Sequence, residues 1–161
     1  MEKQLERVKK HKNYLFTNRG TKENPDWIRV KTSTDFALTF NAETETFDYI
    51  ADENPSDELK SYKPTIGQTQ TAYIGDFVFD YIFDFAFEQK AGMAAVTEGM
   101  VVFQQKNENG EYAAWRFDMG VTIDTYDLVS GTLSYQMGVR GTVERGSATI
   151  DTDGKPLFAL N

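Results

Sequence analysis

The sequence contains no cysteine and a single histidine, His11. Without cysteine the chain has no disulfide, no thiolate nucleophile and no cysteine-ligated metal. The absence also fits folding in a reducing cytoplasm. Because the one histidine lies in a charged segment, we expect it to be solvated, and no Ser-His-Asp or Cys-His arrangement can be assembled around it in a rigid core.

Long apolar runs are also missing, and no stretch of about 18 apolar residues exists, so no transmembrane helix is expected. The first twelve residues are charged throughout and lack the apolar centre of a secretory signal. Four prolines and twelve glycines are ordinary levels. With 161 residues the chain has the size of one domain with a sizeable core, and we expect residues 1–161 to form a single domain.

Charge is distributed unevenly along the chain. Residues 1–12 carry five basic side chains against two acidic ones, a net charge of +3. Because the whole chain has a net charge of −8, residues 13–161 carry a net charge of −11. Such an acidic body repels nucleic-acid phosphates, which disfavours a DNA-gripping surface. The excess of acid can serve solubility alone, or residues 1–12 can form a basic arm that docks on an acidic neighbour.

The first half of the chain predicts short strands separated by loops. Residues 14–26 are interpreted as a loop because of Asn18, Gly20, Asn24 and Pro25. Strands are expected over 27–31, 34–40, 45–50 and 64–74. Residues 51–63 break the pattern and predict a long, acidic, exposed loop, with a helical turn or two starting at Asn54-Pro55. Loops of about 12 residues or more inside a compact domain are often functional.

Residues 76–89 are assigned to a helix, although aromatic residues alternate there as in a strand. Asp76, Asp80 and Asp84 recur every fourth residue, and on a helical wheel they lie opposite one continuous apolar arc. A strand would instead bury the carboxylates beside aliphatic side chains. We expect a cap at Asp76 and an end near Gly92. Phe77 and Phe87 fall on the acidic side, where an aromatic ring is loose surface or a contact with another chain.

The rest of the chain predicts antiparallel strands with one wet face. Residues 99–105 and 112–125 flank an Asn109-Gly110 hairpin signal. Odd positions from 113 to 123 are apolar, while the even positions 116, 118, 122 and 124 are polar. The same parity returns over 133–143, and 148–151 and 155–160 are joined at Asp153-Gly154. The fold class is therefore mainly β (α+β), an antiparallel β-sandwich or barrel with one flanking α-helix.

Chemical sites are weakly indicated. Paired carboxylates occur at Asp80 with Asp84 and at Asp124 with Asp127. A hydrolase needs two such groups facing each other across a cleft with separated acidities, whereas acids on solvated faces are common. An acid-pair hydrolase is thus one alternative function.

A calcium site and a sugar site have partial signals. The run from Asp52 begins like a calcium loop, but Asp57 and Lys63 stand where glycine and glutamate are required. Exposed Trp and Tyr on a β-sandwich can stack on sugars, which makes a carbohydrate-binding module the second alternative. Trp115 is expected in the core, whereas Trp27 and Tyr112 are unassigned. No catalytic, cofactor-binding or metal-binding residue is assigned, and no cofactor is expected.

Four short runs carry a resemblance to a known family: FDYIADE at 47–53, SYKP at 61–64, QTQTAY at 68–73 and Gly75-Asp76. In this order and spacing they resemble the corresponding stretch of the major tail tube proteins of siphophages, the long-tailed bacteriophages with non-contractile tails. The family's helix often begins Asp-Pro. Here Phe77 replaces the proline, which should leave the cap intact. Outside residues 47–84 the similarity is one of pattern.

The resemblance implies a structural virion protein, not an enzyme. Members form hexameric rings that stack head-to-tail into a hollow tail tube, made and assembled in the bacterial host cytoplasm. The implied partners are other copies of the chain, the tape-measure protein, and tail-tip and terminator proteins. DNA passes through without specific binding during ejection, and no membrane is involved.

The resemblance also implies which residues contact neighbouring subunits. The loop 51–63 and the N-terminal arm 1–12 would reach adjacent subunits or rings. The inter-subunit and ring-stacking candidates are Lys9, Lys10, Asp52, Glu53, Asp57, Glu58, Lys60, Tyr62, Phe77 and Phe87. An acidic bore would let DNA slide, because no phosphate finds a cation there. The lumen-facing candidates are Asp118, Asp124 and Glu144, although Arg116 and Arg140 share those strand faces.

Overall fold

The computed structural model describes residues 4–161, so the expectations for residues 1–3 lie outside it. Its strands and its helix are β1 (Tyr14–Asn18), β2 (Trp27–Arg29), β3 (Ala37–Thr39), β4 (Ala42–Phe47), β5 (Ser56–Tyr62), β6 (Thr65–Thr71), α1 (Phe77–Phe87), β7 (Val96–Lys106), β8 (Tyr112–Asp127), β9 (Thr132–Ile150) and β10 (Pro156–Leu160). Short 3₁₀ turns span Lys10–Lys12 and Gly92–Ala95.

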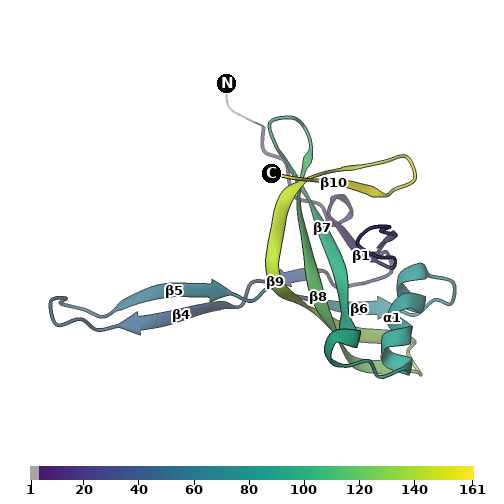
Figure 1. Ribbon diagram of the computed structural model, residues 1–161, viewed down its shortest axis with the longest axis horizontal. Coiled ribbons are helices and arrows are strands. Elements are labelled where there is room, and N and C mark those ends of the chain that lie inside the picture. The colour runs from purple at the N-terminus through teal and green to yellow at the C-terminus, as the bar shows by residue number, and fades with distance from the viewer. Residues whose placement is uncertain (1–3) are drawn as a thin grey trace.

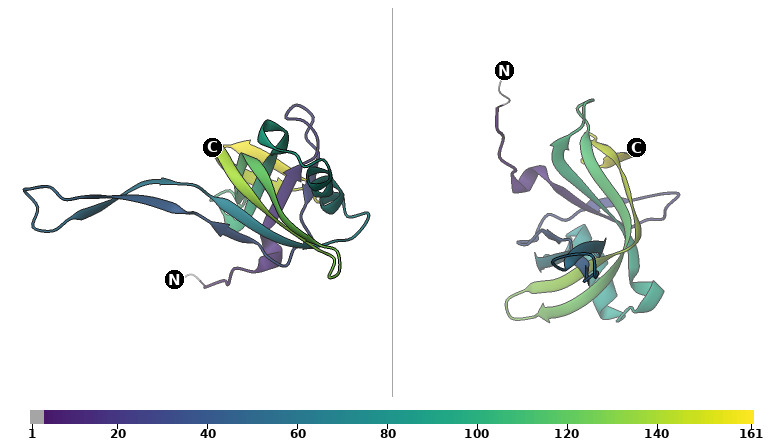
Figure 2. Two further views of the ribbon diagram at one scale, coloured as in Figure 1. Left: turned by 90° about the horizontal axis from the view of Figure 1, so that it is seen from below. Right: turned by 90° about the vertical axis from the view of Figure 1, so that its left-hand side faces the viewer.

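Eight of the strands form one antiparallel sheet in the order β2-β1-β7-β8-β9-β6-β3, with β10 paired to β9 off this path. β4 and β5 form a separate two-stranded sheet that projects away from the rest of the molecule (Figure 1). Figure 2 shows the same projection from two further directions. The expected mainly β, antiparallel fold with one α-helix is confirmed.

The large sheet folds over on itself around its main core. Leu15 and Ile28, near one edge of the sheet, share a buried cluster with Ile66 and Met137, near the other edge. Two distant parts of one sheet can meet only if the sheet curves through the long strands between them. Helix α1 adds Val78, Phe79, Ile82 and Phe85 to the cluster.

The long strands follow the alternation predicted from the sequence. Phe117, Met119 and Val121 of β8 are buried in the main core, and Leu133, Tyr135 and Met137 of β9 join them. The opposite face carries a smaller apolar cluster at one end of the sheet: Phe16, Trp27, Met100, Val102, Ala114 and Ala148. Both predicted turns are present, with Gly110 and Gly154 at positive φ as hairpin turns require.

Helix α1 lies within the predicted range of 76–89, and its cap is the predicted one. One carboxylate oxygen of Asp76 accepts a hydrogen bond from the backbone amide of Val78 at 3.1 Å. The other accepts from the Thr32 hydroxyl at 2.7 Å. Gln70 donates from Nε2 to Thr32 Oγ1 at 3.1 Å and accepts at Oε1 from the Tyr135 hydroxyl at 2.9 Å. A continuous relay therefore links the sheet to the start of the helix.

Three sequence-based expectations are wrong. Residues 14–18, expected in a loop, form the buried strand β1, which pairs with both β2 and β7. Residues 51–63 are not a loop with a helical turn, because Ser56–Tyr62 form β5, paired antiparallel with β4. Residues 148–151, expected as a separate strand, continue β9 as far as Ile150.

Asp26 joins two hairpins of the fold. Its carboxylate contacts Arg19 of the β1–β2 loop at 2.7 Å and Lys155, next to β10, at 3.4 Å. Lys155 also donates to the carbonyl of Trp27 at 2.7 Å. The hydrogen bond from Arg19, opposed in part by desolvation, holds the pKa of Asp26 below its ordinary value of 3.8.

We expect Asp26→Asn to lower the free energy of unfolding by less than about 1 kcal/mol at pH 7, because the pair is exposed. A lowered folded-state pKa gives stability that is present above the unfolded-state pKa of about 3.9 and is lost as the pH falls through the folded value. The difference from the parent should therefore shrink steadily in thermal unfolding as the pH falls below about 4. Glu23→Gln, the same charge change in the same exposed loop, is the control, and an equal effect of both would contradict a specific role for Asp26.

Candidate interaction surfaces

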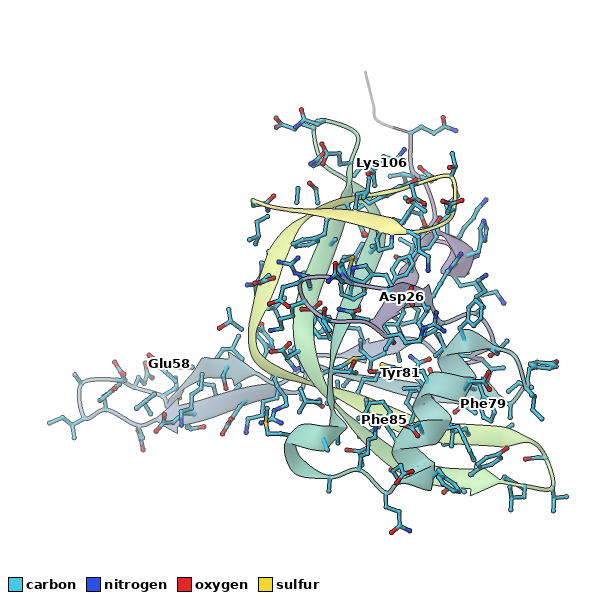
Figure 3. The ribbon with its side chains drawn as sticks, turned by 45° about the vertical axis from the view of Figure 1, so that its right-hand side comes forward. Asp26, Glu58, Phe79, Tyr81, Phe85 and Lys106 are labelled. Atoms are coloured by element: carbon cyan, nitrogen blue, oxygen red, sulfur yellow. The ribbon has the colours of Figure 1, made fainter. Side chains whose placement is uncertain are left out.

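The most exposed element of the molecule is the arm hairpin, residues 42–62. Every residue of β4 and β5 is exposed except Phe47, which is half-buried, and none belongs to either core cluster. At its tip the rings of Phe47 and Tyr49 stack 5.5 Å apart, and the neighbouring side chain of Ile50 is fully exposed. Figure 3 shows Glu58 on this arm, far from the body that holds Asp26 and Tyr81.

The base of the arm hairpin is fixed to the body by a few defined contacts. The amide of Lys63 donates to the carbonyl of Phe40 at 3.0 Å. The Phe40 ring meets those of Tyr62 and Trp115 edge-on, each at 5.9 Å. Asn41, with φ of 50°, donates from its side chain to the Lys63 carbonyl and the Thr65 hydroxyl. The arm therefore leaves the body through a tight neck.

The arm hairpin is strongly acidic. Residues 42–62 contain seven carboxylates and one lysine, a net charge of −6 out of −8 for the whole chain. Lys60 lies 3.6 Å from Glu45, and Lys63, just past the arm, lies 3.8 Å from Glu43. Exposed pairs of this kind contribute little. A two-stranded hairpin without a packed face is marginally stable in water, so this arm is poorly stabilised by its own chain.

The predicted inter-subunit residues fall on three separate elements. Asp52 and Glu53 lie at the tip of the arm hairpin, and β5 carries Asp57, Glu58, Lys60 and Tyr62, all exposed. Lys9 and Lys10 lie in the N-terminal segment. Phe77 and Phe87 lie at the two ends of α1, 62% and 72% exposed. The structure groups the first six on one arm, and their role in contacts between chains stays a prediction.

The described part of the N-terminal segment, residues 4–12, is exposed and attached to the end of β7. The amide of Lys9 donates to Gln104 Oε1 at 2.7 Å, and Gln104 Nε2 donates to Glu6 at 3.2 Å. A hydrogen bond from Lys12 at 3.1 Å holds the pKa of Glu6 below its ordinary value. The segment is therefore attached to the body through Gln104, while the side chains of Lys9, Lys10 and His11 are exposed.

Helix α1 turns its buried side toward the sheet and leaves aromatic rings outside. The guanidinium of Arg19 lies 4.9 Å from the Phe77 ring centroid. Phe87 contacts the half-exposed Phe83 at 5.8 Å between ring centroids. These rings are therefore partly covered within the chain, and they form two small surfaces, one at each end of the helix.

Asp118 and Glu144 lie on the β8–β9 face opposite the main core, whereas Asp124 lies at the irregularity between Ile123 and Thr125 of β8. Asp118 is 3.4 Å from Lys22, and Glu144 is 2.6 Å from Arg116. Arg116 also lies over the Phe158 ring at 4.6 Å. Asp124 is exposed, and no ion pair involves it within residues 4–161. Two of the three carboxylates are thus balanced by a cation in the same chain.

One member of each carboxylate pair, Asp84 and Asp127, has partners within the chain. Asp84 on the exposed side of α1 pairs with Lys90 at 2.8 Å and raises its pKa. Asp127 accepts hydrogen bonds from the amides of Val129 and Ser130, which hold its pKa below the ordinary value. Among residues 4–161, no three His, Asp or Glu side chains are grouped as a metal site, and no helix is long and apolar enough to cross a membrane.

Aromatic residues that suggested a sugar site are mostly packed. Trp27 is buried in the smaller apolar cluster, and Trp115 is half-buried against Phe103 at 5.5 Å. Tyr112 is half-buried beneath Lys106, whose ammonium lies 5.2 Å from the ring centroid. Neither tryptophan is therefore free to stack on a ligand.

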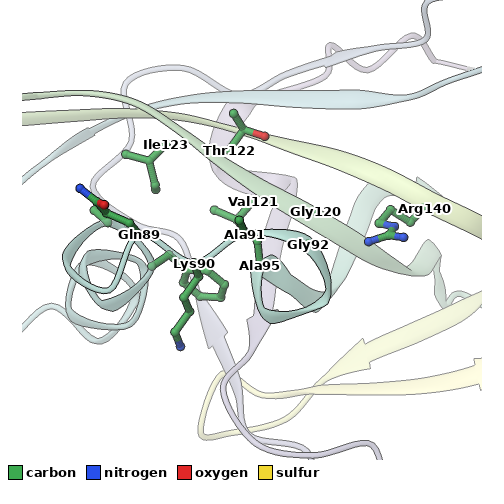
Figure 4. A pocket seen from close by; sticks show the side chains of 12 residues that line it. Gln89, Lys90, Ala91, Gly92, Ala95, Gly120, Val121, Thr122, Ile123 and Arg140 are labelled. Carbon is green, nitrogen blue, oxygen red and sulfur yellow. The ribbon is translucent and has the colours of Figure 1, made fainter.

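The open clefts on the body include two of similar volume. One, of about 650 Å³, lies between the end of α1, the Gly92–Ala95 turn and β8, with Lys90 and Arg140 at its sides (Figure 4). The other, of about 690 Å³, is lined by the N-terminal segment, the chain after β2, β3 and parts of β6 and β7. Neither cleft has a signal in the sequence, because each is assembled from segments far apart in the chain.

No family model matches the sequence, and no curated protein matches it. The fold, however, belongs to the class seen in tail-like particles. It resembles a chain of the anti-feeding prophage cap, the AFP tube terminating cap, with a TM-score of 0.56 and 11% identity over 92% of this chain and 96% of that one.

Two further solved structures share this fold. A chain from the tail of an empty GTA particle with C6 symmetry gives a TM-score of 0.57 at 11% identity, covering 84% of this chain and 96% of that one. A chain from the PVC sheath/tube terminator of an extracellular contractile injection system gives 0.53 at 10% identity, covering 88% and 97%. At such identities the likeness establishes a common fold.

Proposed function

We propose that this chain is a structural subunit of a phage-like tail tube, assembling as hexameric rings stacked head-to-tail. The observation that carries the proposal is the arm hairpin: a projecting, acidic element without a core, on a body with a tail-type fold. An element that its own chain barely stabilises is expected to be ordered by a neighbour.

The sheet edges favour the same assembly. β2 and β3 terminate the large sheet on its two sides, and both are three-residue strands. Short edges limit uncontrolled pairing, while a defined contact with another copy satisfies their free backbone groups. A head-to-tail contact that closes makes a ring, and a second contact stacks the rings. The C6 symmetry reported for the GTA tail supports six copies in the ring.

We further propose the siphophage form of this function, with the tube as the conduit for DNA ejection. The run that resembles siphophage tube proteins, residues 47–84, corresponds to the arm tip, β5, β6 and α1. The tape-measure, tail-tip and terminator proteins would be its partners. The β8–β9 face with Asp118, Asp124 and Glu144 would line the bore, where Asp124 is the carboxylate left to repel phosphates.

A second candidate is the ring that closes a tube, because two of the similar structures come from a tube terminating cap and a sheath/tube terminator. Such a subunit would form one ring and stop. A tube subunit would add further rings on the same contact. The two roles therefore differ in the length of the assembled particle.

The proposal predicts concentration-dependent rings or filaments from the purified protein, observed by negative-stain microscopy and sedimentation. Where nucleation is slow, a matching tail-tip assembly should seed them. Extended tubes support the tube subunit, and isolated hexameric rings support the closing ring. A protein that stays monomeric at high concentration, with the seed present, contradicts both.

A further inference from the structure

The second cleft, here called the seam groove, is the opening between the two edges of the folded sheet. Arg29 and Val30 line it from the β2 side, and Leu38 lines it from β3. Its floor is formed by Val101 and Phe103 of β7 together with Gln68 of β6. The groove has a volume of about 690 Å³, and it lies where the curved sheet does not close.

The chain between β2 and β3 crosses this seam at one end only. The amide of Val30 donates to the carbonyl of Leu15 at 2.9 Å, on the β1 side. The amide of Thr34 donates to the carbonyl of Thr69 at 2.8 Å, on the β6 side. Beyond this crossing β2 and β3 are not paired with each other, and the groove lies between them.

Gln68 on the floor has no partner within the described chain. Its side chain is 3% exposed, and neither Nε2 nor Oε1 makes a hydrogen bond within residues 4–161. Gln70, two residues along the same face, uses both of its amide atoms in the relay to Tyr135 and Thr32. Buried amides are almost always bonded, so the unpaired one requires an explanation. Both amide atoms are closed off from solvent, so an incoming backbone would satisfy them only after the side chain turns toward the groove.

The rim of the groove is basic. Lys10, Arg29 and Lys31 line it together with His11, against a single carboxylate, that of Asp35. Arg29 donates to the carbonyl of His11, and none of these four side chains forms an ion pair within residues 4–161. The apolar floor and basic rim fit a segment that is acidic and partly apolar.

We infer that the seam groove receives the tip of the arm hairpin, residues 47–53, from a neighbouring copy of this chain. The inference rests on the proposed self-assembly. The tip offers the exposed side chains of Tyr49 and Ile50 for the floor and Asp48, Asp52 and Glu53 for the rim. The hairpin of the same chain projects away from the body, so the occupant is another copy (Figures 1 and 2).

The absence of cysteine permits a direct test by disulfide trapping. Ile50→Cys protein is mixed with Thr34→Cys protein under assembling conditions and then oxidised. We expect a cross-linked dimer that forms in assemblies and is lost on dilution before oxidation. Asp153→Cys replaces Thr34→Cys as the control, because Asp153 lies in the β9–β10 turn, outside the groove lining. Equal cross-linking of the two partners, or none with Thr34→Cys in well-formed assemblies, overturns the inference.

Charge reversal gives an independent readout. Lys10→Glu with Lys31→Glu, or Asp52→Lys with Glu53→Lys, should each raise the critical concentration for assembly about tenfold or more, which corresponds to about 1.4 kcal/mol. Mixing the two variants should restore assembly in part, because the reversed tip then meets a reversed groove. Assembly that is unchanged in both variants overturns the groove as the docking site while leaving the proposed function intact.

Gln68→Leu separates docking from folding. Removal of an unpaired buried amide should raise the melting temperature of the unassembled chain by about 2–5 °C. The same change should raise the critical concentration about tenfold, because the incoming backbone loses its partner. A variant that is more stable and assembles equally well contradicts the inference. If the parent itself never assembles, even when seeded, the proposed function fails together with the groove.

Discussion

Replacement of residues 42–62 by a single glycine is expected to give a folded protein that no longer assembles. The change leaves the sequence Phe40-Asn41-Gly-Lys63 at the former base of the arm. Phe40 and Lys63 are already joined by a backbone hydrogen bond, and Asn41 already has a positive φ. An Asn-Gly pair at this place therefore suits a tight two-residue hairpin turn between β3 and β6.

The body should tolerate this deletion because the arm contributes nothing to either core cluster. At the neck, the deletion chiefly removes the edge-on packing of the Phe40 ring against Tyr62. We expect the melting temperature to shift by only a few degrees, since an exposed element of this kind adds little stability. Near-ultraviolet circular dichroism and thermal unfolding of the monomer measure this part.

Assembly should fall steeply, with a critical concentration raised by about 100-fold or more if the arm is a principal contact. Sedimentation and negative-stain microscopy measure this change. A narrower variant replaces residues 48–55 by Asn-Gly and keeps β4 and β5, since Phe47 and Ser56 are paired in the hairpin register. Loss of assembly in both variants assigns the contact to the tip.

The control keeps the arm and changes a different turn. Glu108→Gln alters one charge in the β7–β8 turn and should leave assembly unchanged. Normal tubes from the deletion variant would show that the arm has no role in stacking. Deletion of 51–63, the segment expected to be a loop from sequence, is a poorer test because it removes β5 and leaves β4 without its partner.

The elements that were predictable from sequence share one physical property. In β8 and β9 one face packs on the core and the other contacts water, so apolar and polar residues alternate. This alternation predicts a strand. Helix α1 was predictable for the same reason, because its acids gather opposite the buried Val78 and Ile82. An element with one buried face and one exposed face therefore has a hydrophobic periodicity that the sequence reveals.

The strands that were not predicted lack that asymmetry. In β1 successive side chains enter different apolar clusters, Leu15 the main core and Phe16 the smaller one, so no polar position alternates. In β4 and β5 both faces are wet, so polar residues occupy most positions without a period. Hydrophobic patterning cannot identify strands that are buried on both faces or exposed on both.

The interaction surfaces were predictable only in part, for a related reason. The six arm candidates belong to one continuous stretch of sequence, and the structure places them on one element. The seam groove has no such signal, because Lys10, Arg29, Lys31 and Gln68 come from separate segments. Only the folded chain brings those cations and the unpaired amide together.

The second large effect concerns the relay beneath helix α1. Gln70→Leu should lower the free energy of unfolding by about 2–3 kcal/mol, because it leaves the buried Tyr135 hydroxyl without an acceptor and Thr32 without one donor. Gln68→Leu is the matched control: the same substitution on the same strand face, where the amide has no partner within residues 4–161. The two changes should shift stability in opposite directions.

Tyr135→Phe completes the argument as a double-variant cycle. Alone it leaves Gln70 Oε1 unpaired and should cost about 1–2 kcal/mol, whereas added to Gln70→Leu it should cost less, or stabilise, because the orphaned hydroxyl is then removed. Chemical denaturation of the unassembled protein measures all four proteins. Additive effects would mean that Tyr135 and Gln70 act independently, contrary to the 2.9 Å hydrogen bond between them.

Unfolding at alkaline pH tests the burial of Tyr135 through the ionisation of its hydroxyl. Burial, with a further contribution from Asp76, raises the pKa of Tyr135 far above its ordinary value of 10.0. The folded protein binds the proton of the Tyr135 hydroxyl more tightly than the unfolded chain does. The contribution of this proton to the free energy of unfolding is therefore complete below about pH 10 and is lost as the pH rises above the unfolded-state pKa. Tyr135→Phe should therefore lose less stability than the parent between about pH 10 and 11.5. Equal losses of stability in the variant and the parent would mean that the Tyr135 hydroxyl contacts water. That result would contradict its place in the hydrogen-bond relay.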